Sequence, residues 1–330
     1  MPGLARLDSA CSGLYIVWTV WILNATVRGA QVRTRFFASL TALTVVATAL
    51  SLTPAWAQGA GPGVTGFGNT DIPPRGDRNW KPSRTVDGQP DIQGLWDQRN
   101  DITTYSIQAG AADRAQHVRL GGGRAQLGKP IVDPKNGLIP YQPWAAEKAK
   151  FLYAQHLHPS GAANLDPVTR GFLEGVPRIN YMGLVQIIQV PGYVVMAHEY
   201  GHHYRVIPLD GRPHLPGDIK LWMGDSRGHW EGNTLVVDVT NNNDQTWFDI
   251  VGSFHSDALH MVERWTFVGP DRIEYDVTMT DPKVFARPWK LVMTLGRNEP
   301  QENWENAVWE GNRAADVIMG TEAEKSTEHK

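Results

Sequence analysis

A series of short runs rich in Val, Ile, Thr and aromatic residues constrains the fold of this chain more than any other feature. The series begins near Leu184, and turn sequences such as Pro191-Gly192 and Gly269-Pro270-Asp271 separate the runs. Strands that follow one another through short turns, without helices between them, form an antiparallel sheet. We predict strands at residues 92–98, 184–190, 193–207, 234–240, 259–268, 272–280, 289–295 and 303–309, and short strand-like runs at 220–223 and 229–230 that flank residues 224–228.

A meander of this length is expected to curl and close, because closure removes the exposed edges of an open sheet. The predicted fold class is therefore mainly β, an antiparallel meander of about eight to nine strands that closes into a barrel. A loop-rich N-terminal wrap precedes the meander. One short helix is expected at 143–156, where Pro143 suits an early helical position. The predicted parts are a lead-in at 58–90, one barrel domain at 91–315 with a loop and helix insert at 100–180, and a polar tail at 316–330.

The N-terminal region has the pattern of a secretory signal peptide. Arg33 and Arg35 supply positive charge, residues 36–50 are apolar, and Ala55-Trp56-Ala57 is a small-x-small cleavage sequence. Residues 1–57 are therefore predicted to be a signal peptide, with a start that lies too far upstream. The apolar run is short for a bilayer, so we expect no stable membrane span after processing. The predicted location is periplasmic or extracellular.

The composition excludes several classes of function. Lys and Arg number 31 against 34 Asp and Glu, and the net charge of −3 offers no basic excess to neutralise nucleic-acid phosphates. Cys11 is the one cysteine and lies in the predicted signal peptide. Neither a disulfide framework nor a thiolate zinc site is therefore expected, and nucleic acid is not a predicted partner. The pattern makes no prediction of the oligomeric state.

Gly94-Leu95-Trp96, at the start of the first predicted strand, resembles the Gly-x-Trp opening of lipocalin-like (calycin) barrels. This resemblance implies that Trp96 plugs the closed end of a lipocalin-like barrel. It also implies that an Arg from a late strand meets the Trp. Arg264 and Arg297 are both candidates for that partner.

Several longer motifs resemble a large family of uncharacterised secreted bacterial proteins. The likeness covers most of residues 84–310 and implies fold and export, but no mechanism. Some relatives carry a Cys where this chain has Gly171-Phe172-Leu173, so no cysteine chemistry is carried over. The motifs are Arg84-Thr85-x-Asp87-Gly88-x-Pro90-Asp91, Gly175-Val176-Pro177-Arg178, Leu209-Asp210-Gly211-Arg212-Pro213-His214, Gly224-Asp225-Ser226-x-Gly228-x-Trp230-Glu231-Gly232, Leu259-His260-x-Val262-Glu263-Arg264 and Asp281-Pro282 with Pro288-Trp289.

The densest group of chemically active residues is His198-Glu199-Tyr200-Gly201-His202-His203-Tyr204-Arg205. His198-Glu199-x-x-His202 matches the His-Glu-x-x-His zinc pattern, but that pattern requires a helix to bring both His to one face. The flanking residues favour a strand instead, in which side chains alternate between two faces. The predicted strand places His198, Tyr200, His202 and Tyr204 on one face, and Glu199, His203 and Arg205 on the other.

The predicted catalytic residues come from this stretch and from the run around His260. His198 and His202 are predicted to transfer protons, and Glu199 or Glu263 to orient them or act as base. Tyr200 or Tyr204 would donate a hydrogen bond to a developing oxyanion. Arg205 and His260 complete the predicted catalytic set.

A second set of residues is predicted to bind substrate. Arg178 could clamp a carboxylate, and His255 with Asp257 forms part of a second polar cluster. Tryptophans in the β region could line a pocket for a flat or apolar molecule. The tryptophans concerned are Trp222, Trp230, Trp265 and Trp289. By contrast, residues 210–212 and 225–228 are predicted to be turns, and 241–244 a solvated loop.

These patterns leave three functions open. The first is an exported barrel that binds an apolar or aromatic small molecule and performs isomerisation, elimination or hydrolysis without a cofactor. The second is a non-catalytic protein that binds a lipid, pigment or aromatic. The third is a hydrolase that uses a divalent metal, held by His198 and His202 with His214, or with His255 or His260 in its place.

Overall fold

The computed structural model describes residues 76–98, 104–108, 130–298, 302–306 and 312–319. The predicted signal peptide, most of the lead-in and most of the polar tail lie outside these residues. None of the helices within these ranges has the length and apolar character needed to cross a bilayer.

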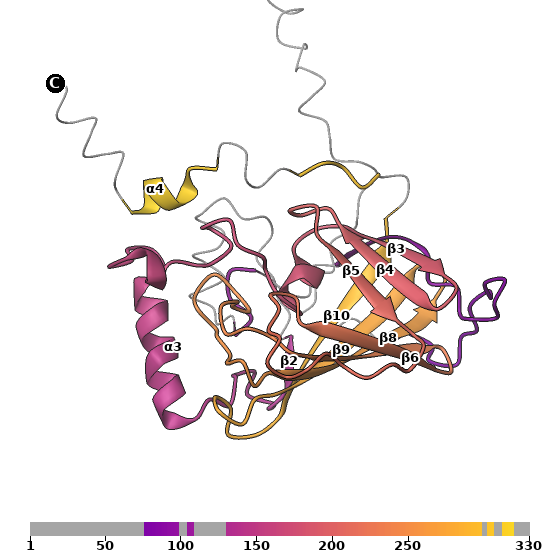
Figure 1. Ribbon diagram of the computed structural model, residues 1–330, viewed down its shortest axis with the longest axis horizontal. Coiled ribbons are helices and arrows are strands. Elements are labelled where there is room, and N and C mark those ends of the chain that lie inside the picture. The colour runs from indigo at the N-terminus through magenta and orange to yellow at the C-terminus, as the bar shows by residue number, and fades with distance from the viewer. Residues whose placement is uncertain (1–75, 99–103, 109–129, 299–301, 307–311, 320–330) are drawn as a thin grey trace, which may run out of the picture. The chain divides into compact units, whose positions relative to one another are not determined.

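The described residues form one antiparallel sheet of ten strands (Figure 1), so the predicted fold class is confirmed. The hydrogen-bonded order is β5-β4-β3-β1-β10-β9-β8-β7-β6, and β2 pairs with β10 outside this path. The strands are β1 (Gly94–Gln98), β2 (Ile131–Asp133), β3 (Val185–Val190), β4 (Tyr193–His198), β5 (Tyr204–Pro208), β6 (Asp225–Glu231), β7 (Thr234–Thr240), β8 (His260–Gly269), β9 (Arg272–Thr280) and β10 (Trp289–Arg297).

The two ends of this path, β5 and β6, lie side by side and nearly close the sheet into a barrel. Among the described residues no backbone hydrogen bond joins them. Side chains make the contact instead, since Arg205 Nη2 donates to Ser226 Oγ at 3.0 Å. Gly228 of β6 allows the close approach, because a Cβ there would lie 2.7 Å from side-chain carbons of Ile207 and Leu209.

Several predicted elements differ from the observed ones. Residues 225–228 are not a turn, because Asp225–Glu231 pairs with β7 throughout as strand β6. Residues 220–223 contribute one isolated bridge, from Leu221 to Asn242, and the described part of 303–309 also forms no strand. The predicted solvated loop at 241–244 is mostly buried, since Asn241, Asn242 and Asn243 are each less than a tenth exposed.

The helix α3 (Pro143–Gln155) lies close to its predicted position and packs on the loop that follows β7. Leu152 lies against Gly252, and the Trp144 ring lies 6.0 Å from that of Phe254. Three further short helices in the described residues are η2 (Ala162–Asn164), η3 (Arg178–Tyr181), which is fully buried, and α4 (Ala314–Ile318).

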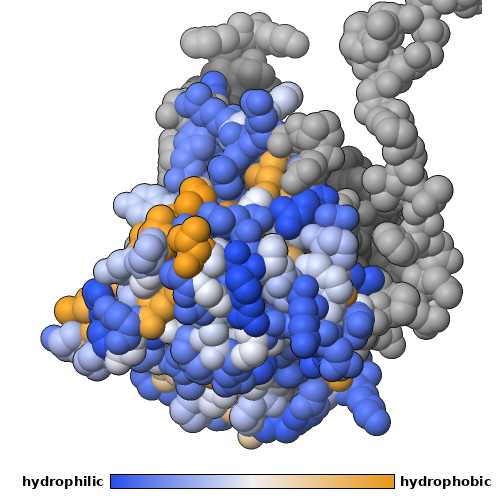
Figure 2. Space-filling view, turned by 90° about the vertical axis from the view of Figure 1, so that its right-hand side faces the viewer, coloured by the Kyte–Doolittle hydropathy of each residue, from blue (hydrophilic) through white to orange (hydrophobic). Residues whose placement is uncertain are grey.

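Side-chain alternation directs large apolar residues into the barrel interior. Trp96, Trp265 and Tyr275 are all less than 1% exposed. The guanidinium carbon of Arg297 lies 4.4 Å from the centre of the Trp96 ring, so Arg297 rather than Arg264 is the partner of this Trp. Figure 2 shows a mainly hydrophilic outer face with a band of apolar side chains. The exposed apolar residues of β3 and β5 are Ile188, Val190 and Val206.

Candidate functional site

The His-rich stretch is a β-hairpin, which corrects the prediction of a single strand over 193–207. β4 ends at His198 and β5 begins at Tyr204. Gly201 and His202 between them have positive φ angles of 65° and 57°. Gly adopts this left-handed conformation without steric cost, so it supports the reversal of the chain. The predicted alternation therefore breaks at the turn, and Tyr200, His202 and Tyr204 do not follow His198 onto one face.

The hairpin places His198 and His203 opposite each other. The backbone N of His198 donates to the carbonyl of His203 at 2.8 Å, which continues the register in which Ala197 faces Tyr204. Directly opposite residues of an antiparallel pair project from the same face, with Cβ atoms about 5 Å apart. His198 is 3% exposed, so that face is the barrel interior.

His203 forms a dyad with Glu174, a residue of the loop before η3. Its Nδ1 lies 2.6 Å from Glu174 Oε2, and the Glu174 carboxylate is buried. A carboxylate at one ring nitrogen fixes the tautomer and the orientation of an imidazole. This is the arrangement in which the other nitrogen can accept or deliver a proton.

A buried ion pair, Arg205 with Glu263, lies beside the histidines in the barrel interior. Arg205 of β5 donates to Glu263 of β8 through two nitrogens, at 2.6 and 3.2 Å. Tyr275 donates to the same carboxylate at 2.8 Å, and Asn180 of η3 donates to it at 3.1 Å. The bidentate geometry and the additional donors compensate the cost of burying both charges.

Several polar atoms around this pair have no hydrogen-bond partner among the described residues. They are both ring nitrogens of His198, Asn180 Oδ1, Arg205 Nε and Trp265 Nε1. Buried polar groups in folded proteins are nearly always hydrogen-bonded, so each exception requires a physical explanation. The atoms named here, a subset of these exceptions, include both donors and acceptors. Trp265 belongs with the other three because its ring lies 4.5 Å from that of Tyr275, which bonds to Glu263. We define these four side chains as the interior polar cluster.

The environment keeps the His198 ring neutral. Its pKa is lowered from 6.5 to about 3, because burial penalises the charged form and because Arg205 and His203 oppose a further positive charge. A neutral imidazole offers one donor and one acceptor at the same time. His198 can therefore exchange hydrogen bonds with a neutral polar group.

The lowered pKa of His198 predicts acid sensitivity of the fold. Below pH 6.5 the unfolded chain binds a proton at His198 that the folded chain does not bind until the pH is near 3. Unfolding therefore takes up a proton, and stability falls as the pH drops through this window. Between pH 7 and pH 5 the loss from this residue is about 2 kcal/mol. Urea unfolding at both pH values should show it for the natural chain and not for His198→Leu, whereas equal pH dependence would contradict it.

The structure separates the other predicted catalytic residues from this cluster. His202 and Tyr204 are exposed, and 71% of the surface of Tyr204 is accessible to solvent. Glu199 accepts from the backbone of Leu184 at the end of the hairpin. Tyr200 is half-buried there, and burial together with Glu174 raises its pKa. His260 projects from the outer face of β8 and bonds to Asp238.

The predicted binding residues divide in the same way. Trp265 lies in the interior cluster, and Trp230 and Trp289 also pack on the barrel core. Trp222 stacks outside on Phe172, with ring centres 5.0 Å apart. Other predicted binding residues already have protein partners. Arg178 is paired with Asp166 at 2.7 Å, His255 with Thr246 at 2.7 Å, and Asp257 with Lys283 at 2.6 Å.

The residues predicted for a metal do not converge. His198 faces the interior, His202 lies in the exposed turn, and His214 bonds to Asp225 and Asp238 on the outer face. Within the described ranges, no three His, Cys, Asp or Glu side chains are arranged to hold a metal ion.

Two other features of the chain lack the properties of the interior cluster. Gly224-Asp225-Ser226-Arg227-Gly228 has the Gly-x-Ser-x-Gly spacing of a nucleophile elbow, but an elbow needs a strand-to-helix turn and this segment enters strand β6. A pocket of about 450 Å³ lies between α3 and nearby loops. Its polar lining is bonded to protein, since Ser253 donates to Asp249 and Gln108 accepts from the backbone of Ile139.

Four residues of the site were not among the predicted catalytic or binding residues: Glu174, Asn180, His203 and Tyr275. Gly201 was the available signal for His203, because a glycine inside a strand pattern marks a turn or bulge. A turn at Gly201 brings His203 opposite His198. The other three reach the site from distant segments, and no local pattern marks them.

Together the fold and this site define a nearly closed antiparallel barrel with a buried cluster of polar and ionisable side chains. Comparisons with protein-family models, with curated proteins and with solved structures found no match for the chain.

Proposed function

We propose that the barrel interior binds a small, largely apolar or aromatic molecule and that His203 and Glu174 transfer a proton to or from it. The observation that carries the proposal is His198, a 3% exposed ring whose two nitrogens lack partners among the described residues. The protein would act without a cofactor, after export through the N-terminal signal peptide predicted from the sequence.

The chemistry of the interior polar cluster specifies the polar group of the ligand. Arg205 Nε and Trp265 Nε1 require an acceptor, Asn180 Oδ1 requires a donor, and neutral His198 can serve as either. Glu263 already balances the charge of Arg205. An additional unpaired charge would be costly at this depth, so a neutral group is favoured. A hydroxyl or carbonyl group on an apolar body fits these requirements.

The His203–Glu174 dyad supports acid/base chemistry at the same place. His203 shares the interior face with His198, and Glu174 holds its Nδ1. A proton abstraction, isomerisation or elimination next to a carbonyl or hydroxyl needs one such base and a fixed donor for the developing oxyanion. Arg205 and Trp265 are donors of that kind.

A matched pair of probes tests ligand binding. 1-Naphthol and naphthalene share an apolar body, and only 1-naphthol carries a hydroxyl. We expect calorimetry to give a dissociation constant about tenfold lower for 1-naphthol, because the hydroxyl satisfies buried groups that naphthalene leaves unpaired.

The same pair identifies the cluster as the origin of the preference. His198→Leu should reduce the preference for 1-naphthol by most of that factor. His229→Leu, which alters an exposed histidine of β6, should leave it unchanged. Equal affinity for both probes, or a preference that survives His198→Leu, would argue against binding at this cluster.

A further inference from the structure

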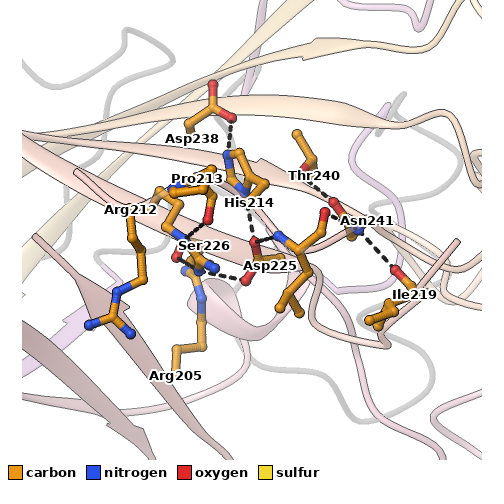
Figure 3. Close-up of polar contacts among 12 residues, drawn as sticks. Arg205, Arg212, Pro213, His214, Ile219, Asp225, Ser226, Asp238, Thr240 and Asn241 are labelled. Atoms are coloured by element: carbon orange, nitrogen blue, oxygen red, sulfur yellow. Dashed lines mark hydrogen bonds and ion pairs between the residues drawn. The ribbon is translucent and has the colours of Figure 1, made fainter. Parts of the chain in front are cut away.

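The loop between β5 and β6 is fastened to the outer face of the sheet by His214 (Figure 3). The two ring nitrogens bond to carboxylates of different strands. Nδ1 lies 2.8 Å from Asp225 Oδ2 of β6, and Nε2 lies 2.8 Å from Asp238 Oδ1 of β7. One imidazole therefore connects the loop to two neighbouring strands.

This geometry depends on the protonation of His214. An ionised carboxylate only accepts hydrogen bonds, so both ring nitrogens must donate, which requires the cationic imidazolium. Two other charged or titratable groups face the ring or its partners. Arg227 donates to Asp225, and His260 of β8 bonds to the second oxygen of Asp238 at 2.8 Å. The hydrogen bond to His260, with His214 adding to it, lowers the pKa of Asp238, so this carboxylate stays ionised.

A second anchor of the same loop does not titrate. The side-chain amide of Asn241 donates to the carbonyls of Leu215, Pro216 and Ile219, and Figure 3 shows the bond to Ile219. This anchor fixes the half of the loop that leads into β6. The half that leaves β5 is held by His214, by Arg227, which donates to the Pro213 carbonyl at 3.1 Å, and by Arg212, which donates to the Tyr193 hydroxyl at 3.0 Å. Of these anchors, His214 bonds to two strands, β6 and β7.

The loop joins the two strands that lack a backbone ladder between them. In the described part of the sheet, β5 and β6 are held by the Arg205–Ser226 bond and by packing on Gly228. In Figure 3, Asp225, which bonds to His214, directly precedes Ser226, which accepts the hydrogen bond from Arg205. We call this contact between β5 and β6 the seam. The attachment of the loop by His214 therefore bears directly on the seam.

We propose that His214 is a proton-dependent latch on the β5–β6 seam. The cationic ring holds the loop across β6 and β7 and keeps the seam closed. Loss of the proton removes one of the two hydrogen bonds of His214 and loosens the seam. The seam lies beside Arg205, so its opening would expose the interior near the middle of the barrel.

Hydrogen exchange measured by mass spectrometry on the full chain tests the latch. In His214→Gln, amides of residues 204–216 and of β6 should exchange about tenfold faster than in the natural chain, because a charge-assisted bond is lost. Exchange in β9 and β10 should not change. His229→Gln is the matched control, since His229 lies on β6, the strand of Asp225, and has an exposed side chain.

The natural chain supplies a test that needs no substitution. After correction for the intrinsic exchange rate, the seam should exchange faster at pH 8.5 than at pH 6, and His214→Gln should abolish this difference. Asp238→Asn should weaken the seam in the same way. Exchange at the seam that is unaffected by His214→Gln, or equally affected by His229→Gln, would overturn the proposal.

Discussion

Replacing Glu263 with Gln is expected to lower the free energy of unfolding by about 3–5 kcal/mol. Glu263 is fully buried and binds Arg205 through both carboxylate oxygens. The substitution keeps the shape of the side chain but leaves the buried guanidinium without its counter-charge. Gln keeps one acceptor oxygen for Tyr275 and Asn180, but its amide group puts a donor where the second carboxylate oxygen accepted from Arg205. Urea unfolding monitored by tryptophan fluorescence measures the effect.

The chain contains its own control for this prediction. Glu231 pairs with Arg264, the residue that follows Glu263 in β8, but both of these side chains are more than a third exposed. Glu231→Gln should leave the unfolding transition close to that of the natural chain, because solvent screens this exposed pair. The double variant Arg205→Met, Glu263→Leu should recover most of the free energy of unfolding that Glu263→Gln loses, because no unpaired charge remains in the interior. A Glu263→Gln variant as stable as Glu231→Gln would show that the interior pair is not desolvated as described.

Replacing His203 with Gln is expected to reduce proton-transfer catalysis by about 10²–10⁴-fold. The probe reaction is the ring opening of 5-nitrobenzisoxazole, an apolar aromatic. The base takes the proton at C3, the N–O bond breaks, and the electron pair ends on oxygen as a coloured nitrophenolate. Only an acid/base residue is needed, so the assay does not depend on the natural substrate. Absorbance gives the rate.

His202 is the matched control for His203. The two residues are adjacent, but His202 is exposed in the turn, whereas His203 faces the interior and holds Glu174. His202→Gln should leave the rate unchanged, and Glu174→Gln should lower it with His203→Gln. Equal effects at both histidines, or no rate above that of free imidazole, would rule out catalysis by the dyad and leave a binding function.

Local patterns predicted most of the sheet. β7 and β9 have the bounds predicted from their Val, Ile and Thr runs, because those runs are flanked by clear turn residues. β6 was misjudged, since Asp225, Ser226 and Gly228 favour turns in isolation and adopt a strand only through pairing with β7. Propensity is a weak guide where tertiary pairing decides.

The candidate site was predictable only in part. The sequence pointed to His198, Arg205 and Glu263, all of which the structure brings together in the interior. Strand alternation through Gly201 predicts Tyr204 and His202 on the face of His198, whereas the turn at Gly201 leaves both exposed. Glu174 and Asn180 are contributed by segments around η3, and their role depends on long-range packing that no local spacing records.

The most direct test of the account is the nitrogen NMR signal of the His198 ring, assigned by its loss in His198→Leu, during titration with 1-naphthol. We predict a neutral ring at pH 5 whose signals shift and saturate with the affinity found by calorimetry, while those of His202 and His229 stay fixed. A His198 signal that does not respond while 1-naphthol binds, or a ring that is protonated at pH 5, would contradict the account.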